Sequence, residues 1–290
     1  MEKEKQFMQT LRSNTLFAFA ITITAAFCCA KENATISSTT SKQVIGQSRN
    51  SCVQIISDSG KSSGTGFFIS DKYIATCFHV IAAESKNGTN ISFAIYPDLV
   101  AILNTGEKVK VRCISIPSQN NPEPLQSDFA ILECTNLPSN QSINSLKLAM
   151  NDSMLIVGDE IYYSGYPLAT PAMLTFRGMI SGIGSNNDII CIQGSINRGN
   201  SGGALMSSNR TVIGILSMRE GGISKGLQDM SVYIDRVSSQ GSVHLMGVNP
   251  LEAINVLTKT LDTYISTGIG YAINIKYLRA YLKKNNLKSQ

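Results

Sequence analysis

The sequence predicts an all-β protein built from many short antiparallel strands, arranged as a barrel or a sandwich. Short apolar runs recur at close spacing from residue 43 onward, and Gly, Asn and Pro residues separate them. Only two segments, residues 250–261 and 276–286, have helical periodicity. This pattern is typical of antiparallel β folds. The expected strands are Cys52–Ile56, Gly64–Ser70, Tyr73–Thr76, Ile91–Tyr96, Val109–Ile116, Phe129–Cys134, Glu160–Tyr163, Leu174–Ile183, Ile189–Gln193, Thr211–Met218 and Gly268–Ile275.

The two helical segments lie late in the chain. Asn249 precedes the first and is a suitable N-cap, because its side-chain oxygen can accept free N–H groups of the first turn. This helix falls within a long connection, residues 219–267, between the strand that ends at Met218 and the strand that begins at Gly268. We therefore expect a helical insertion between two late strands and a helix at the C-terminal end.

Composition narrows the class of protein. The 290 residues are 43% hydrophobic and 16% charged, which is ordinary for a folded globular chain. The net charge of +5 is modest, and no basic run is interleaved with aromatic residues. Nucleic acid is therefore not expected as a partner.

The N-terminal segment is typical of export. Lys3, Lys5 and Arg12 precede the uncharged stretch Thr15–Ala30, which is shorter than the about 20 residues of a membrane span and suits a signal peptide. We expect residues 1–30 to be a signal peptide or an N-terminal anchor, and residues 31–45 a linker. A buried helix is the structural alternative. Phe27 before the cysteine pair argues against lipid attachment, while cleavage after Ala30 and an uncleaved anchor both stay open.

Export predicts an extracytoplasmic location, periplasmic or secreted. Contact with a membrane would then occur only through the N-terminal segment, if that segment is uncleaved or lipidated. Five of the seven cysteines lie beyond this segment, and no C-x-x-C spacing occurs, which argues against a disulfide scaffold or a zinc site. Buried free thiols are expected, with a Cys113–Cys134 bridge as the alternative. No metal or cofactor is expected.

The most specific motif surrounds Ser201. The string Gly199–Gly203 (GNSGG) puts one hydroxyl among glycines just before an apolar strand. A serine attacks a carbonyl only with a base beside it and N–H groups that bind the oxyanion, and glycines let the backbone turn to supply them. A tight Gly-rich turn is the structural alternative.

Candidates for the base and its orienting carboxylate lie beside two earlier strands. Of the two histidines, His79 follows an apolar strand, whereas His244 has no acidic residue near it in sequence. Asp128 opens the apolar run that ends at Leu132. Alone, each residue has a structural explanation: a core histidine for His79 and a turn cap for Asp128.

Together, the order His79, Asp128, Ser201 is that of chymotrypsin-type serine proteases. The sequence resembles the HtrA/Deg branch of the trypsin-like serine proteases over roughly residues 45–285. The stretches that carry the resemblance are Ile196–Leu205, the segment around His79, Ser127–Leu132 and Thr267–Ile273.

The resemblance implies a chymotrypsin-like fold of two six-stranded antiparallel β-barrels, with a C-terminal helix and a helical insertion. The protease domain would cover residues 46–286, with barrel one at about 46–150 and barrel two at about 151–286. HtrA proteins usually add a PDZ domain, but no such domain fits after residue 285, so the resemblance is to an HtrA/Deg-type protease without one.

The resemblance also implies the role of each site residue. Ser201 would be the nucleophile, His79 the base, and Asp128 the group that orients the imidazole. The backbone N–H groups of Gly199 and Ser201 would form the oxyanion hole.

Substrate-binding positions follow from the same resemblance. They are Ser195, Asn197, Leu216, Ser217 and Met218. None is anionic, so a small or medium apolar side chain is expected at the position before the cleaved bond.

Position 200 is Asn, whereas trypsin-like digestive enzymes carry an Asp there that pairs with a new N-terminal amine. A neutral amide cannot form that ion pair. The sequence therefore predicts activity without zymogen cleavage.

The function expected from the sequence is an exported serine endopeptidase that acts on protein or peptide substrates through an acyl-enzyme. The alternatives are a catalytically silent, protease-like binding protein and an esterase on another fold, which the triad order disfavours. The insertion at residues 219–267 either shapes substrate access or decorates the surface.

Overall fold

The computed structural model describes residues 40–57, 59–60, 62–87, 90–117, 126–137, 143–150, 155–219, 222–241, 244–264 and 268–290. The chain divides into two compact units, Met1–Gln43 and Val44–Gln290. The expected signal peptide and most of the expected linker lie outside the described residues. Among those described, we find no helix with the length and apolar character needed to cross a membrane.

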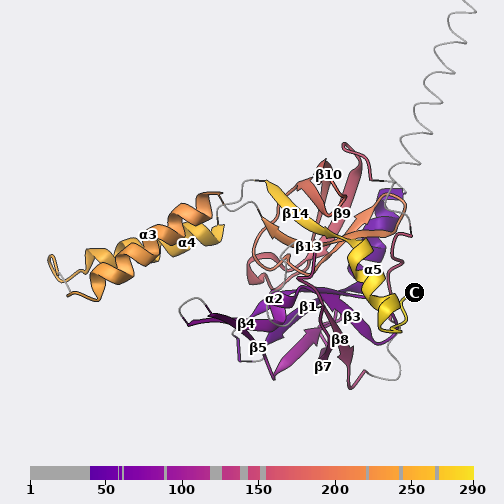
Figure 1. Cartoon of the computed structure of the whole chain (residues 1–290), viewed down its shortest axis with the longest axis horizontal. Helices are drawn as coiled ribbons and strands as arrows, with labels where there is room; N and C mark the ends of the chain where they lie inside the picture. Colours follow the sequence, from indigo (N-terminus) through magenta and orange to yellow (C-terminus); the bar gives the residue numbers. More distant parts are fainter. Residues whose placement is uncertain are drawn as a thin grey trace, which may run out of the picture. The chain divides into compact units, whose positions relative to one another are not determined.

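Six strands of the second unit close into a first antiparallel barrel, in the order β1-β2-β3-β8-β7-β6 (Figure 1). In β7, side chains alternate between exposed and buried along the first half of the strand, as a barrel wall with one face inward requires. Ile55, Ile74 and Ile131 are fully buried in its core. The strands are β1 (Cys52–Ser57), β2 (Ser63–Phe68), β3 (Tyr73–Thr76), β6 (Leu99–Ile102), β7 (Lys108–Ser115) and β8 (Ala130–Cys134).

A second closed barrel has the order β10-β11-β14-β13-β12-β9. Its core includes Ile161, Ile190, Leu205 and Ile213. Two closed six-stranded antiparallel barrels confirm the predicted fold class. The strands are β9 (Glu160–Gly165), β10 (Leu174–Ile183), β11 (Ile189–Gln193), β12 (Ala204–Ser207), β13 (Val212–Arg219) and β14 (Ile269–Asn274).

Three strands were not expected from the sequence. β4 (Ala82–Asn87) pairs with β5 (Asn90–Ile95) in a separate two-stranded sheet, while β6 and β12 are four-residue strands in the barrels. Such short strands have too few residues for alternation to mark them, and β4 is largely polar. Their pairing with neighbouring strands defines them instead.

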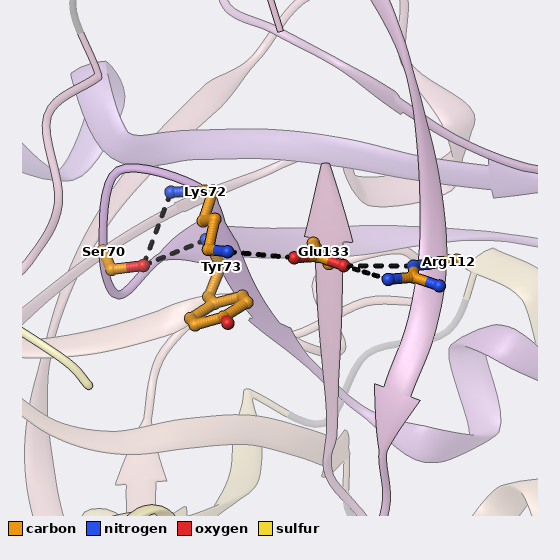
Figure 2. Close-up of polar contacts among 5 residues, drawn as sticks. All are labelled: Ser70, Lys72, Tyr73, Arg112 and Glu133. Atoms are coloured by element: carbon orange, nitrogen blue, oxygen red, sulfur yellow. Dashed lines mark hydrogen bonds and ion pairs between the residues drawn. The ribbon is translucent and has the colours of Figure 1, made fainter. Parts of the chain in front are cut away.

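A row of partly or fully exposed polar side chains runs from the β2–β3 turn across β8 to β7 in the first barrel (Figure 2). Glu133 in β8 accepts from Lys72 at 3.1 Å, and its other oxygen accepts from Arg112 in β7 at 2.6 Å. Hydrogen bonds from Arg112 and then Lys72 lower the pKa of Glu133. At the β2–β3 turn, the backbone N–H of Tyr73 donates to Ser70 Oγ. The row therefore matches the register in which Glu133 stands opposite both Tyr73 and Arg112.

Helices complete the second unit. Residues 44–51 of this unit are helical, and the one-turn helix α2 (Phe78–Ile81) follows β3. The C-terminal helix α5 (Ile275–Lys284) confirms the expected helix, and the Asn274 side chain caps its first turn. Leu278 and Leu282 of α5 are buried in the same hydrophobic cluster as the first barrel.

The insertion between β13 and β14 holds two helices rather than the one expected. α3 (Gly222–Ser238) precedes α4 (Pro250–Tyr264), and the two pack against each other (Figure 1). Asn249 Oδ1 accepts the N–H groups of Leu251 and Glu252 at 3.1 and 3.4 Å, which confirms the predicted cap.

All five cysteines within the described residues are free thiols. Cys113 stands opposite Leu132 and Cys134 opposite Val111, so the β7–β8 register does not oppose the two sulfurs. The alternative of a Cys113–Cys134 bridge is therefore not realised, and the default of free thiols holds.

Candidate active site

The carboxylate of Asp128 lies at the centre of the candidate site. Asp128 is 4% exposed and stands two residues before β8. Its Oδ1 accepts the backbone N–H of His79 at 3.0 Å, and its Oδ2 lies 2.7 Å from Nδ1 of the His79 ring. An ionised carboxylate only accepts hydrogen bonds, so we assign the ring proton to Nδ1. Nε2 is then unprotonated in the neutral imidazole.

The one-turn helix α2 positions the imidazole. Phe78, Val80 and Ile81 are buried in the core, whereas the His79 side chain is 48% exposed. The apolar neighbours anchor the turn and leave the ring at the surface. The other histidine, His244, lies exposed in the connection between α3 and α4.

The pKa of His79 reflects two opposing influences. The partial burial of the half-exposed ring is the largest single influence and disfavours the charged form, but the charge of Asp128 and its hydrogen bond together outweigh it. The pKa of His79 therefore lies above its ordinary value of about 6.5. Asp128 thus favours protonation of the ring, as a base that must accept a proton requires.

Ser217 in β13 connects Asp128 to Ser201. Its buried hydroxyl donates to Asp128 Oδ2 at 3.0 Å, and its backbone carbonyl accepts the hydroxyl of Ser201 at 2.9 Å. The structure therefore brings His79, Asp128 and Ser201 together, although they are far apart in sequence. In the described residues, the Ser201 hydroxyl makes this bond rather than one to His79.

The turn around Ser201 depends on two glycines with positive φ. Gly199 has φ 97° and Gly202 has φ 87°, the left-handed region that other residues avoid. A Cβ on Gly199 would lie 2.3 Å from the carbonyl oxygen of Tyr166, and one on Gly202 would lie 2.0 Å from that of Thr65. Neither position has room for a side chain. The glycine string therefore serves close packing as well as the turn.

Thr65 in β2 of the first barrel holds this turn of the second. Its backbone N–H donates to the carbonyl of Ser201 at 2.9 Å, and its hydroxyl donates to the carbonyl of Gly199 at 2.6 Å. The candidate nucleophile is thus fixed against the barrel that carries His79 and Asp128.

The Arg198–Gly199 peptide group has a defined orientation. The carbonyl of Arg198 accepts the N–H of Leu168 at 2.6 Å, and no peptide bond in the described chain is cis. In a trans peptide the C=O and N–H groups point in opposite directions, so the N–H of Gly199 is directed away from Leu168. Neither this N–H nor that of Ser201 donates to a residue that the structure describes. Both N–H groups are available to an external acceptor.

The model of the family described as "Trypsin-like peptidase domain" matches residues 64–215, which is more than half of the chain. The matched stretch contains His79, Asp128 and Ser201. The chain belongs to the trypsin-like peptidase family.

Relatives indicate the branch of this family. The chain is 31% identical over 158 residues to "Probable periplasmic serine endoprotease DegP-like" of Bartonella henselae, covering 52% of this chain and 27% of that protein. It is 30% identical over 158 residues to "Putative protease Do-like 3, mitochondrial" of Arabidopsis thaliana, covering 52% of this chain and 24% of that protein. This trypsin-like peptidase is thus similar to Do-like and DegP-like proteases, and it spans about a quarter of the length of these curated relatives.

Solved structures share the fold. The HtrA-type protease AlgW with tripeptide has a TM-score of 0.52 at 18% identity, over 84% of this chain and 62% of that one. The serine endoprotease from Yersinia pestis has a TM-score of 0.51 at 19% identity, over 85% of this chain and 66% of that one. At this identity the likeness concerns the fold alone.

In this trypsin-like peptidase, the amide of Asn200 supports the turn from within. Asn200 is fully buried, and its Nδ2 donates to the carbonyl of Ser195 at 3.2 Å. Its Oδ1 is buried without a hydrogen-bond partner in the described residues. The Asn200 side chain therefore holds the 195–200 loop by donating a hydrogen bond from its amide nitrogen. An ionised Asp side chain has no such donor.

The expected substrate-binding residues differ in their surroundings. Ser195 is exposed and Asn197 is half-buried, so both lie near the surface beside the Ser201 turn. The Leu216 side chain is fully buried in the core of the second barrel, and the Ser217 hydroxyl is turned to Asp128. Neither side chain is exposed to a substrate here, because adjacent strand residues point to opposite faces: Leu216 points into the barrel core, and Ser217 points toward Asp128. The Met218 side chain lies outside the described part of the chain.

The sequence predicts Ser217 as a substrate-binding residue, but it did not reveal the bonds of Ser217 to Asp128 and Ser201. Ser217 stands 89 positions from Asp128 and 16 from Ser201, and a serine within an apolar strand carries no motif of its own. Only the closure of the second barrel against the first brings its hydroxyl to the carboxylate.

Cys77, His79 and Asp128 place potential metal-ligand atoms within 4.8 Å of one another. A metal needs the thiolate, whereas burial and then the charge of Asp128 raise the pKa of Cys77 well above its ordinary value. The thiol instead donates to the carbonyl of Leu216 at 3.1 Å. Cys77, His79 and Asp128 therefore form part of a hydrogen-bonded network around the Asp128 carboxylate rather than a set of metal ligands.

Proposed function

We propose that this chain is an exported serine endopeptidase that hydrolyses peptide bonds through an acyl-enzyme. The observation that carries the proposal is the buried carboxylate of Asp128, which binds both the backbone and the ring N–H of His79. Ser217 then connects that carboxylate to the hydroxyl of Ser201. Such a set provides a nucleophile, a base and a group that orients the base.

The proposed reaction begins when the Ser201 hydroxyl rotates from the Ser217 carbonyl toward Nε2 of His79. Its oxygen attacks the substrate carbonyl while Nε2 takes the proton. Asp128 stabilises the resulting imidazolium, and His79 then donates the proton to the departing amine. Water then attacks the carbonyl of the acyl-enzyme while Nε2 of His79 takes its proton. His79 returns that proton to the Ser201 oxygen as the bond between this oxygen and the acyl group breaks.

The proposed oxyanion hole is formed by the N–H groups of Gly199 and Ser201. The orientation of the Arg198–Gly199 peptide, with its carbonyl bound to Leu168, supports this assignment. Loss of one donor of this kind costs about 3–4 kcal/mol of transition-state stabilisation. Ser195 and Asn197 remain candidates for contact with substrate on the same loop.

Activity without zymogen cleavage is also proposed. The loop between residues 195 and 201 is held by the Asn200 amide and by Thr65, and neither bond requires a chain terminus. A form made without its N-terminal segment should be no more active than the full chain. Activity that appears only after cleavage near β1 would contradict this part of the proposal.

The central test is covalent labelling of the purified full chain with a fluorophosphonate, followed by a casein cleavage assay. We expect labelling and cleavage in the wild type, and neither in Ser201→Ala. Ser208→Ala, which changes an exposed serine in the β12–β13 turn, is the matched control and should retain both. Absence of labelling in the wild type would favour the alternative of a catalytically silent binding protein. Labelling without cleavage would point to narrow peptide specificity or to an esterase.

Export rests on the segment Thr15–Ala30 and is supported by the DegP-like relative whose name describes it as probably periplasmic. N-terminal sequencing of the protein from the extracytoplasmic fraction tests it. A first residue near position 31 would indicate cleavage, and an intact N-terminus in the membrane fraction would indicate an anchor. Recovery of the full chain from the cytoplasm would contradict export.

A further inference from the structure

The α3–α4 hairpin exposes an apolar face that its own packing does not use. The contacts between the helices include the bond from Ser231 to Asn255 Oδ1 and that from Asn255 Nδ2 to Asp235, at 2.9 and 3.1 Å. Among the side chains of the pair that the structure describes, Ile234 and Thr258 are buried, at 3% and 4% exposure. The contact between the helices thus holds Ile234 among polar side chains and leaves several other large hydrophobic residues exposed.

Most of the exposed large hydrophobic side chains form a stripe on each helix, and Val232 and Val256 lie off it. We define the apolar face as five residues spaced three or four positions apart: Met230 and Tyr233 on α3, and Ile254, Leu257 and Leu261 on α4. Residues at this spacing share one side of a helix. On each helix the stripe lies about a quarter turn from the contact between the helices, in the same rotational sense. Because consecutive helices joined in a hairpin run antiparallel, both stripes fall on the same side.

The other side of the hairpin carries the charged residues Asp235, Glu252 and Lys259 together with the exposed Val232 and Val256. A two-helix layer with a stripe of larger apolar residues along one side is half of a four-helix bundle. α3 has 17 residues and is therefore about 25 Å long at 1.5 Å per residue. With the helix axes about 10 Å apart, the apolar side of the hairpin has a projected area of roughly 500 Å². Its accessible area is larger because the side chains project from it, and it approaches the about 800 Å² per partner of standard interfaces.

Charge indicates which occupant fits this face. Asp229 and Arg236 are exposed on the edge of α3 that faces away from α4, next to the stripe, and neither has a partner among the ion pairs of the described residues. Along α3, the midpoint between Asp229 and Arg236 lies between Val232 and Tyr233. A twofold axis at that point would set each Asp229 against the partner's Arg236, so the edge is complementary to itself. Residues 222–264 contain three Lys or Arg and four Asp or Glu, which does not favour an anionic membrane surface.

We propose that this chain forms a homodimer in which two α3–α4 hairpins pack through their apolar faces into an antiparallel four-helix bundle. α3 lies on the partner's α3, and α4 lies on the partner's α4. Tyr233 and Leu257 are the central contacts, and two Asp229–Arg236 pairs close the α3 edges. This dimer does not depend on the proposed proteolytic activity. Its hairpins begin directly after β13, the strand that carries Ser217.

Sedimentation velocity of the full chain carrying Ser201→Ala, which prevents self-cleavage, tests the dimer. We expect a dimer at micromolar concentration and a monomer for Leu257→Glu. Val256→Glu is the matched control, because Val256 is the adjacent residue, is 61% exposed against 57% for Leu257, and points away from the apolar face. That control should remain dimeric. All forms carry the same N-terminal segment, so any association through that segment affects them equally.

A charge exchange tests the arrangement of the helices. Asp229→Arg should weaken dimerisation by about tenfold or more, since like charges then meet at both edges. The double variant with Arg236→Asp should restore it. A second pair, Tyr233→Glu and its neighbour Val232→Glu, repeats the face test on α3, with exposures of 63% and 58% in the wild type. Circular dichroism checks that the helices remain folded in every variant.

Several outcomes would overturn the proposal. The wild-type hairpin would not be self-associating if the Ser201→Ala chain were monomeric at about 100 μM, a concentration far above the Kd of stable interfaces of this size. Equal behaviour of Leu257→Glu and Val256→Glu would remove the apolar face from the interface. Co-sedimentation of a monomeric chain with phosphatidylcholine–phosphatidylserine vesicles, lost in Leu257→Glu, would assign the face to a membrane instead.

Discussion

Replacing Asp128 by Asn should abolish most activity while leaving the fold intact, because every hydrogen bond around the residue can be reassigned. The backbone N–H of His79 must face an oxygen, so the amide keeps Oδ1 in its present place, 3.0 Å away. The amide nitrogen then replaces Oδ2 and donates to Nδ1 of the ring. The imidazole must carry its proton on Nε2, and the atom proposed to take the proton of Ser201 is already protonated.

The expected loss in kcat is about 10⁴-fold, the size known for this change in the template triad. Initial rates on a peptide substrate as a function of pH are the assay. The acid limb of kcat/KM should also move to lower pH, since the Asp128 charge and hydrogen bond are what raise the pKa of His79 against its burial.

The same shift has a consequence for stability. A raised pKa means that folding is favoured by protonation of His79. This contribution is present below about pH 6.5 and is lost as the pH rises through the folded pKa. Urea unfolding of the wild type should show this decline, and Asp128→Asn should not. A loss of activity below tenfold, or an unchanged acid limb, would refute the assigned role of Asp128.

Three further changes test the turn and the network around it. Gly202→Ala should lower the free energy of unfolding in urea by about 3 kcal/mol or more, against about 1 kcal/mol for Gly106→Ala. Both glycines have positive φ, but of the two only Gly202 lacks room for a Cβ. Equal losses would show that the contact of this Cβ does not matter. Asn200→Asp should lower the stability by about 3 kcal/mol or more, measured in the same way, because it buries a charge and removes a donor; a neutral effect would imply an unseen cationic partner. Cys77 should resist iodoacetamide until the protein unfolds, while the half-buried Cys113 and Cys191 react before it; mass spectrometry locates the label, and modification of Cys77 before unfolding would contradict its burial.

Elements with a strong local pattern could be predicted from the chain alone. The ten-residue strand β10 has the same bounds in the structure as expected, and α4 begins at Pro250 behind its Asn249 cap. In both, the period of the apolar residues and the flanking residues carry the signal. β12 and α3 were missed for a different reason. β12 has four residues, and α3 has two glycines in its first turns, which disfavour a helix.

The candidate site shows the same division. Sequence alone determined which side chains can do chemistry: one serine among glycines, one histidine behind an apolar strand, and one aspartate before another, in the order of a known triad. It also determined that position 200 carries a neutral amide. Tertiary structure decided what these residues touch. It directed the Ser217 hydroxyl to Asp128 and buried Leu216 in the barrel core. It also placed Thr65 of the first barrel against the turn around Ser201 in the second. The physical reason is that strand patterns and turns are encoded by neighbours in the chain, whereas hydrogen bonds between residues 16 to 136 positions apart exist only once two barrels have closed and packed together.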